Sequence, residues 1–148
     1  MGSQTTKRIC AVPIEHLAFL WPQAEPHLEQ ALRRESFRRF LTSDVLPLLL
    51  DGKAQLWISW DDKRHEVEAA MVTEIIQYPR LKECRVWLIG GRNMKAWSAE
   101  FRDETEAYAV AHGCDIMGAG GRRGFARVGG YREIGVDLIK PLERMAAE

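Results

Sequence analysis

The sequence lacks most of the signals that assign a chain to a specialised class. Its three cysteines, Cys10, Cys84 and Cys114, are few and widely spaced, and no CxxC pair is present. This pattern excludes a disulfide framework and a zinc ribbon and favours reduced thiols, as in a cytoplasmic protein. The four histidines are scattered without HxxxH spacing, so we expect no metal site.

Long apolar runs and an excess of one charge sign are missing as well. No apolar run reaches the roughly 18 residues of a membrane span, and the polar start over residues 1–8 does not resemble a signal peptide. Lys plus Arg and Asp plus Glu number 21 each, which disfavours a nucleic-acid binder that relies on bulk charge. Residues 33–40 interleave Arg with Phe, a pattern that fits nucleic acid but fits a solvated helix face better. We expect neither a membrane nor a nucleic-acid partner.

The composition that is present is that of one globular domain. The chain has 148 residues, 46% of them hydrophobic and 28% charged, enough to bury about two-thirds of the unfolded surface. No repeat, linker or low-complexity tract divides it, so we expect a single domain over residues 1–148.

The first third of the chain predicts a strand followed by helices. Residues 7–12 read as a short strand. Apolar spacings of three and four predict a helix over 14–21 and a second from Pro26 onward, because Pro22 and Pro26 disfavour a helix interior. Residues 42–51 predict a short helix that begins at a Thr-Ser-Asp cluster and stops at a glycine.

The middle of the chain predicts a hairpin. Residues 55–60 and 66–78 have strand composition and are joined by a polar turn over 61–64. Alternation along the second strand places five side chains on one face, namely Val67, Ala69, Met71, Thr73 and Ile75.

The second half predicts a parallel crossover. Residues 82–91 are apolar on both faces around 86–89, which is typical of a central strand. A helix over 94–112, a short strand over 115–118, a short helix over 122–128 and a last strand over 134–139 follow. A helix that joins two strands implies that they are parallel. The predicted class is therefore α/β, with a mixed central sheet of about six strands flanked by helices.

Two segments carry a resemblance to a known family. The segment Val86-Trp87-Leu88-Ile89-Gly90-Gly91-Arg92-Asn93-Met94-Lys95-Ala96 is similar to the fourth strand and helix-opening loop of the GNAT acetyltransferase superfamily. The segment Gly124-Phe125-Ala126-Arg127-Val128-Gly129-Gly130-Tyr131 is similar to that family's short helix and the step into its next strand. The element order resembles the family over residues 7–141. Residues 121–127 also resemble small GNAT-like proteins of bacteriophages and prophages.

The resemblance implies a sheet splayed between strands 4 and 5, with acetyl-CoA bound in the gap. The pantetheine arm would lie along the fourth strand, and the pyrophosphate would lie at the start of the long helix, where free N–H groups and the helix dipole favour an anion. The implied cofactor-binding residues are Trp87, Leu88, Ile89, Gly90, Gly91, Arg92, Asn93, Met94, Lys95, Ala96, Arg122 and Arg123. Trp87 also fits simple core packing.

The implied activity is transfer of an acyl group from acyl-CoA to the amine of a small molecule or a protein. Glu74 is the candidate general base, with Glu83 behind it; an exposed strand carboxylate is the plainer interpretation of Glu74. The family's tyrosine acid has no counterpart in residues 125–127. The alternative is an inactive GNAT-fold binding or structural protein of a phage or prophage, with a phage or host protein as partner, in the bacterial cytoplasm. A gap filled by Met94 or Trp87, with an apolar patch exposed elsewhere, would favour that alternative.

Overall fold

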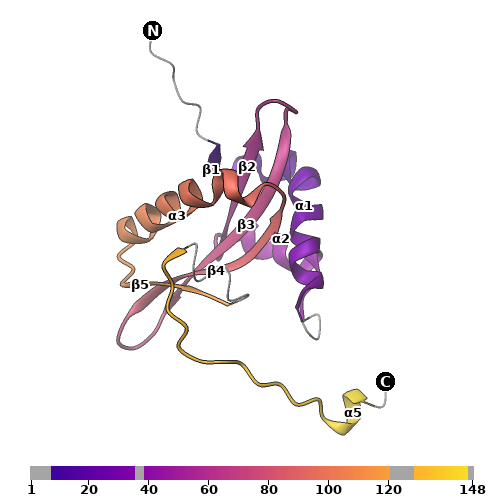
Figure 1. The fold of residues 1–148 in the computed structure, drawn as a ribbon. Coiled ribbons are helices and arrows are strands. Elements are labelled where there is room, and N and C mark those ends of the chain that lie inside the picture. The colour runs from indigo at the N-terminus through magenta and orange to yellow at the C-terminus, as the bar shows by residue number, and fades with distance from the viewer. Residues whose placement is uncertain (1–7, 36–38, 121–128, 147–148) are drawn as a thin grey trace.

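A central sheet covered by helices on both faces organises the computed structural model, which describes residues 8–35, 39–120 and 129–146 (Figure 1). The sheet is five-stranded in the order β1-β2-β3-β4-β5. Neighbours are antiparallel except β4 and β5, which are parallel. The strands are β1 (Ile9–Ala11), β2 (Ala54–Asp61), β3 (Glu66–Gln77), β4 (Lys82–Gly91) and β5 (Ile116–Ala119). This mixed α/β arrangement confirms the predicted fold class.

The predicted count of about six strands is wrong for the described residues. Residues 134–139 form an extended segment without strand pairing, and this segment leads away from the sheet towards the short helix α5 (Glu143–Ala146) (Figure 1). Ile134 is 91% exposed and Leu138 is 89% exposed. The segment has the alternation of a strand, but no strand of the described part of the chain pairs with it. The helix predicted over 122–128 lies outside the described residues.

One continuous helix, α1 (Leu17–Arg33), stands where two helices were predicted. It follows the short 3₁₀ helix η1 (Ile14–His16). Pro22 and Pro26 lie one turn apart on the exposed face. The carbonyls that lose a backbone donor there belong to Ala18 and Pro22, which are exposed, so water can bind them and the helix persists.

The helix α2 (Thr42–Leu50) confirms the short helix predicted over residues 42–51. The carboxylate of Asp44 accepts the Leu41 N–H at 2.8 Å at its start. At its end Gly52 has φ 73°, a conformation that suits glycine. Together α1 and α2 pack on one face of the sheet, over a core that includes Leu28, Leu32, Val45, Leu49, Leu56, Ile58, Val72 and Leu88.

The predicted hairpin is present as β2 and β3, but the faces of β3 switch within it. Ser59 pairs with Ala69 and Trp60 pairs with Val67, so Glu68 has no partner on β2 and forms a bulge. Val67 therefore packs towards α1, whereas Ala69 packs towards α3. The prediction that Val67 shares a face with Ala69 is wrong, because the extra residue reverses the alternation.

The helix α3 (Met94–Ala111) covers the opposite face and joins β4 to β5 (Figure 1). Its buried side chains Trp97 and Phe101 pack with Trp57 and Met71 in a second core. The ring centroids of Trp57 and Phe101 lie 6.2 Å apart at 84°, an edge-to-face contact. No helix of the described part of the chain has the length and apolarity to cross a bilayer.

Candidate active site

The described pairing between β4 and β5 covers only the first half of β4, and we call its end at Val86 the parting point. Their parallel pairing runs from Glu83 opposite Ile116 to Val86 opposite Ala119, whereas β4 continues to Gly91. Strands alternate the direction of their backbone groups. Within the described residues, the groups of Trp87–Gly91 that point away from β3 therefore have no strand to pair with. This open stretch of β4 lies where the resemblance placed the gap between strands 4 and 5.

A second bulge lies at the parting point. Val72 pairs with Leu88 and Thr73 pairs with Val86, so Trp87 has no partner on β3. The bulge turns Trp87 to the same face as Leu88, and its ring meets that of Phe40 at 4.9 Å and 74°. Trp87 thus packs beside the α1–α2 core. A bulge also bends its strand, which helps to separate β4 from the line of β5.

Close packing accounts for the two glycines at the end of β4. A Cβ on Gly90 would lie 1.8 Å from the carbonyl oxygen of His27 in α1, and a Cβ on Gly91 would lie 2.4 Å from Cα of Ala69. The N–H of Gly91 donates to the side chain of Gln30 at 2.8 Å. Gly90 therefore lets α1 approach β4 closely, and Gly91 lets the backbone of β3 do so, whatever these glycines contribute to a ligand.

The first turn of α3 begins directly beyond the open part of β4. The N–H of Arg92 donates to the carbonyl of Glu68 at 2.9 Å, and the indole N–H of Trp97 donates to the carbonyl of Arg92 at 2.8 Å. Asn93 occupies the N-cap position at φ 66° without a side-chain cap. The first-turn N–H groups of Met94 and Lys95 therefore have no capping side chain and, by helix geometry, no acceptor within the helix. They form the positive end of the α3 dipole.

Arg92 is already engaged in ion pairs. One guanidinium nitrogen lies 2.7 Å from the carboxylate of Glu66 and 3.5 Å from that of Asp61. A hydrogen bond from the backbone N–H of Arg64 is the largest cause that holds the pKa of Asp61 below its usual value. The pairs tie the start of α3 to the β2–β3 hairpin. Lys95 is exposed, and Arg122 and Arg123 lie outside the described residues.

Two carboxylates and an arginine lie just before the parting point. Glu74 on β3 is directly opposite Arg85 on β4. Burial raises the pKa of Glu74, against the lowering effect of Arg85, and Glu83 raises it further. Glu83 is only 8% exposed, 3.8 Å from the Arg85 guanidinium. A Cβ on Gly118 would lie 2.0 Å from the Glu83 carboxylate, so this carboxylate reaches over the backbone of β5.

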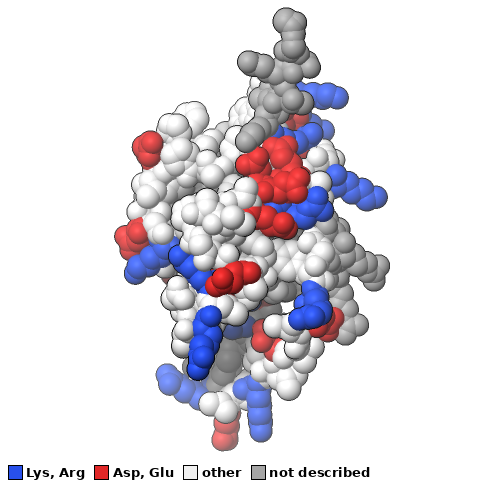
Figure 2. Space-filling view, turned by 90° about the vertical axis from the view of Figure 1, so that its left-hand side faces the viewer, with Lys and Arg blue, Asp and Glu red and all other residues white. Residues whose placement is uncertain are grey.

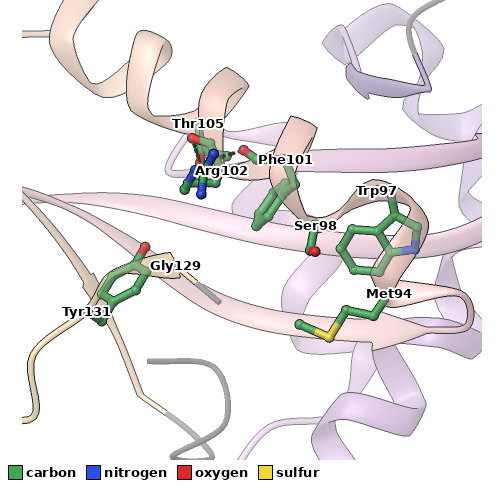
Figure 3. A pocket seen from close by; sticks show the side chains of 8 residues that line it. All are labelled: Met94, Trp97, Ser98, Phe101, Arg102, Thr105, Gly129 and Tyr131. Carbon is green, nitrogen blue, oxygen red and sulfur yellow. Dashed lines mark hydrogen bonds between the residues drawn. The ribbon is translucent and has the colours of Figure 1, made fainter. Parts of the chain in front are cut away.

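A small hollow lies beside α3 (Figure 3). It holds about 10 Å³, room for about one water molecule, so it is a seam and not a substrate cavity. The residues that line the hollow are Met94, Trp97, Ser98, Phe101, Arg102, Thr105, Gly129 and Tyr131. Burial of the Tyr131 hydroxyl is the main cause that raises its pKa to about 12.

The described residues contain no grouped metal ligands, and the one face shown in Figure 2 carries charges of both signs. Among the described residues, no three His, Cys, Asp or Glu side chains are grouped so that they could hold a metal ion. On the face seen in Figure 2, Lys and Arg lie among Asp and Glu around a broad uncharged area.

Comparison with known proteins identifies the fold. No protein-family model and no curated protein matches the sequence. Solved structures match over almost the whole chain. A GNAT family acetyltransferase from Staphylococcus aureus superposes with a TM-score of 0.63 at 11% identity, covering 90% of this chain and 97% of its own. A predicted acetyltransferase with acetyl-CoA from Clostridium acetobutylicum gives 0.65 at 11% identity, with 92% and 96% covered.

An acetyltransferase of known ligand has the same fold. The aminoglycoside acetyltransferase meta-AAC0020 from an uncultured soil metagenomic sample, in complex with sisomicin, superposes with a TM-score of 0.67 at 11% identity, covering 91% of this chain and 95% of its own. The chain therefore has the fold of GNAT acetyltransferases. At these identities the likeness defines the fold alone.

The sequence-predicted site residues fall into two groups in the described part of the structure, and Arg122 and Arg123 lie outside it. Those of 87–96 form one continuous path from the parting point to the first turn of α3. Glu74 lies beside the parting point through its pairing with Arg85. Sequence reasoning missed Arg85, Gln30 and Glu68. A carboxylate within the apolar run of β3 was the visible signal for Glu68, whereas its bulge left no trace in the sequence.

Proposed function

We propose that the protein is an acyl-CoA-dependent N-acyltransferase that transfers an acyl group, in the first instance acetyl, to an amine. The observation that carries the proposal is the open edge of β4 from Trp87 to Gly91, which leads into the uncapped first turn of α3. Such an edge suits the amide-rich pantetheine arm, and such a helix end suits a pyrophosphate. The bound thioester would supply the activated acyl group.

The residues present fit that ligand. The backbone groups of Leu88 and Ile89 would hold the pantetheine arm, with Trp87 at the bulge. The first-turn N–H groups of Met94 and Lys95 would hold the phosphates, and the exposed Lys95 ammonium would add charge. Ala96 would lie beside the phosphates, but its N–H already donates to the carbonyl of Asn93 at 2.8 Å. Gly90, Gly91, Arg92 and Asn93 would shape this turn, and Arg122 and Arg123 remain predicted phosphate contacts. Exclusion of water and alignment of the two reactants would supply most of the rate enhancement.

Glu74 is the proposed general base for the acceptor amine. Its raised pKa makes the carboxylate a stronger base than an ordinary glutamate, and a water molecule could relay the proton. Glu83 lies on the same side of the parting point and would add negative charge. Two carboxylates against one arginine favour a cationic acceptor, such as a small-molecule amine.

Acetyl-CoA binding tests the proposal directly. A ligand with a Kd of 10 µM should stabilise the protein by about 2.7 kcal/mol at 1 mM, a Tm rise of about 5–11 °C for a chain of this size. Release of free CoA thiol should then depend on an added amine, tested with polyamines, aminoglycosides and a lysine peptide. Absence of both a Tm shift and calorimetric heat at millimolar acetyl-CoA would contradict the proposal.

A second candidate is a GNAT-fold binding protein without catalysis. The observation in its favour is the exposure of Ile134, Val136, Leu138 and Leu142, because apolar side chains gathered at a surface commonly mark a partner site. Met94, by contrast, is the first residue of α3, is exposed and lines the small hollow, so it is not buried in the path along β4. Failure of acetyl-CoA to bind, together with a partner lost on deletion of residues 133–148, would favour this candidate. A cytoplasmic, phage-encoded origin remains a prediction from the resemblance.

A further inference from the structure

We propose that Glu68 is a positioning residue that fixes the first turn of α3 through its own backbone carbonyl. This inference rests on the proposed function, because the first turn of α3 is the proposed phosphate site. Glu68 is 0% exposed within a strand of otherwise apolar neighbours. A buried carboxylate is costly unless its oxygens are paired.

The Glu68 carboxylate is held by one arginine in a fork geometry. Nε of Arg8 donates to Oε2 at 3.0 Å, and one terminal nitrogen of Arg8 donates to Oε1 at 3.1 Å. A two-pronged contact of this kind fixes orientation as well as charge. The side chain of Glu68 is therefore anchored to the residue that precedes β1.

The bulge turns this anchor into a support for α3. Glu68 has no partner on β2, since Ser59 pairs with Ala69 and Trp60 with Val67. Its carbonyl instead accepts the N–H of Arg92 at 2.9 Å, the residue before the N-cap of α3. The side-chain anchor and the carbonyl belong to one residue, so the Arg8 contact restrains the backbone of Glu68 and, with it, the carbonyl that binds Arg92.

Other contacts make the support specific to this turn. The Arg92 guanidinium is bound by Glu66 and Asp61, which lie at the same end of the hairpin. The carbonyl of Arg92 accepts the Trp97 indole N–H. The first turn of α3 is thus held through both the side chain and the backbone of Arg92. Among the residues that hold it, Glu68 is the one whose contact with Arg8, when removed, frees the backbone at the start of the helix.

The test compares two variants with a control for stability. Glu68→Gln keeps the volume but removes the charge, and Arg8→Lys keeps the charge but removes the fork. Both should weaken acetyl-CoA about tenfold by calorimetry while kcat at saturating acetyl-CoA changes less than threefold, since a misplaced site mainly raises KM. The double variant should bind acetyl-CoA little more weakly than either single variant, because both substitutions break the same Arg8–Glu68 contact. Thr42→Val removes a 2.7 Å hydrogen bond to Glu25 away from α3 and should lower stability without changing the affinity.

A second readout separates this inference from the proposed function. Amide hydrogen exchange of residues 92–96, measured without ligand, should accelerate about tenfold in Glu68→Gln but not in Thr42→Val. If the wild type fails to bind acetyl-CoA yet the exchange changes as stated, the proposed function falls and the positioning stands. If Glu68→Gln and Arg8→Lys bind acetyl-CoA as the wild type does and leave the exchange unchanged, the inference is overturned.

Discussion

Substitution of Gly90 by alanine tests whether close packing of α1 on β4 explains the glycine at this position. The new Cβ would lie 1.8 Å from the carbonyl oxygen of His27 and 2.7 Å from its carbonyl carbon. Contacts below about 3.0 Å are not sustained, so the two elements must separate by about 1.2 Å or more. The His27 oxygen belongs to helix backbone and cannot rotate away as a side chain would.

The expected loss of stability in Gly90→Ala is at the upper end of the range for overpacked cores. Separation weakens the packing of Ala24, Leu28 and Ala31 of α1 on the sheet. Overpacked cores typically lose 1–3 kcal/mol, so we expect about 3 kcal/mol and a fall in Tm of about 6–12 °C. Urea unfolding followed by circular dichroism measures the difference.

A matched control is available in the same chain. A Cβ on Gly135 would meet nothing within 4 Å, so Gly135→Ala should change stability by less than about 0.5 kcal/mol. A loss below about 0.5 kcal/mol in Gly90→Ala would refute the packing account and leave a role in ligand binding as the reason for the glycine.

Three further outcomes follow from buried groups. Glu74→Gln should lower kcat about 100-fold and abolish the acid limb of the pH–rate profile, because the wild-type rate falls as pH drops through the raised pKa of Glu74; an unchanged limb would exclude Glu74 as the base. Burial raises the pKa of Cys84 from 9.0 to about 11. The neutral thiol should therefore make its whole contribution to the free energy of unfolding below pH 9, and this contribution should fall by on the order of 2 kcal/mol as pH rises to 11. A Cys84→Ala variant that keeps the same decline would contradict this. Trp57→Phe removes a buried 2.9 Å hydrogen bond to the Thr73 hydroxyl and should cost about 1–2 kcal/mol in urea unfolding, whereas no loss would show that the bond contributes nothing.

Local signals predicted the strands and helices because each rests on neighbouring residues. The alternation of the hairpin, the glycine that ends α2 and the helical spacing of Met94, Trp97 and Phe101 are read directly from the sequence. The parallel crossover from β4 to β5 followed from the helix between them. These local features were enough to predict the fold class and the path of residues 87–96.

The remaining features depend on tertiary contacts. The bulges at Glu68 and Trp87 are set by the neighbouring strands, and an extra residue has no sequence signature. Pro22 and Pro26 were expected to break a helix, but both fall on the exposed face of α1. The ion pairs of Arg92 join segments that only the folded hairpin brings together, so its role as a tie to that hairpin was invisible in the sequence.

Hydrogen exchange with and without acetyl-CoA tests the central claim most directly. Peptides that cover Trp87–Gly91 and the first turn of α3 should become protected when the ligand is saturating, while β1 and β2 should not change. Protection of other segments alone, or none at all at millimolar acetyl-CoA, would contradict the claim that the open edge of β4 is an acyl-CoA site.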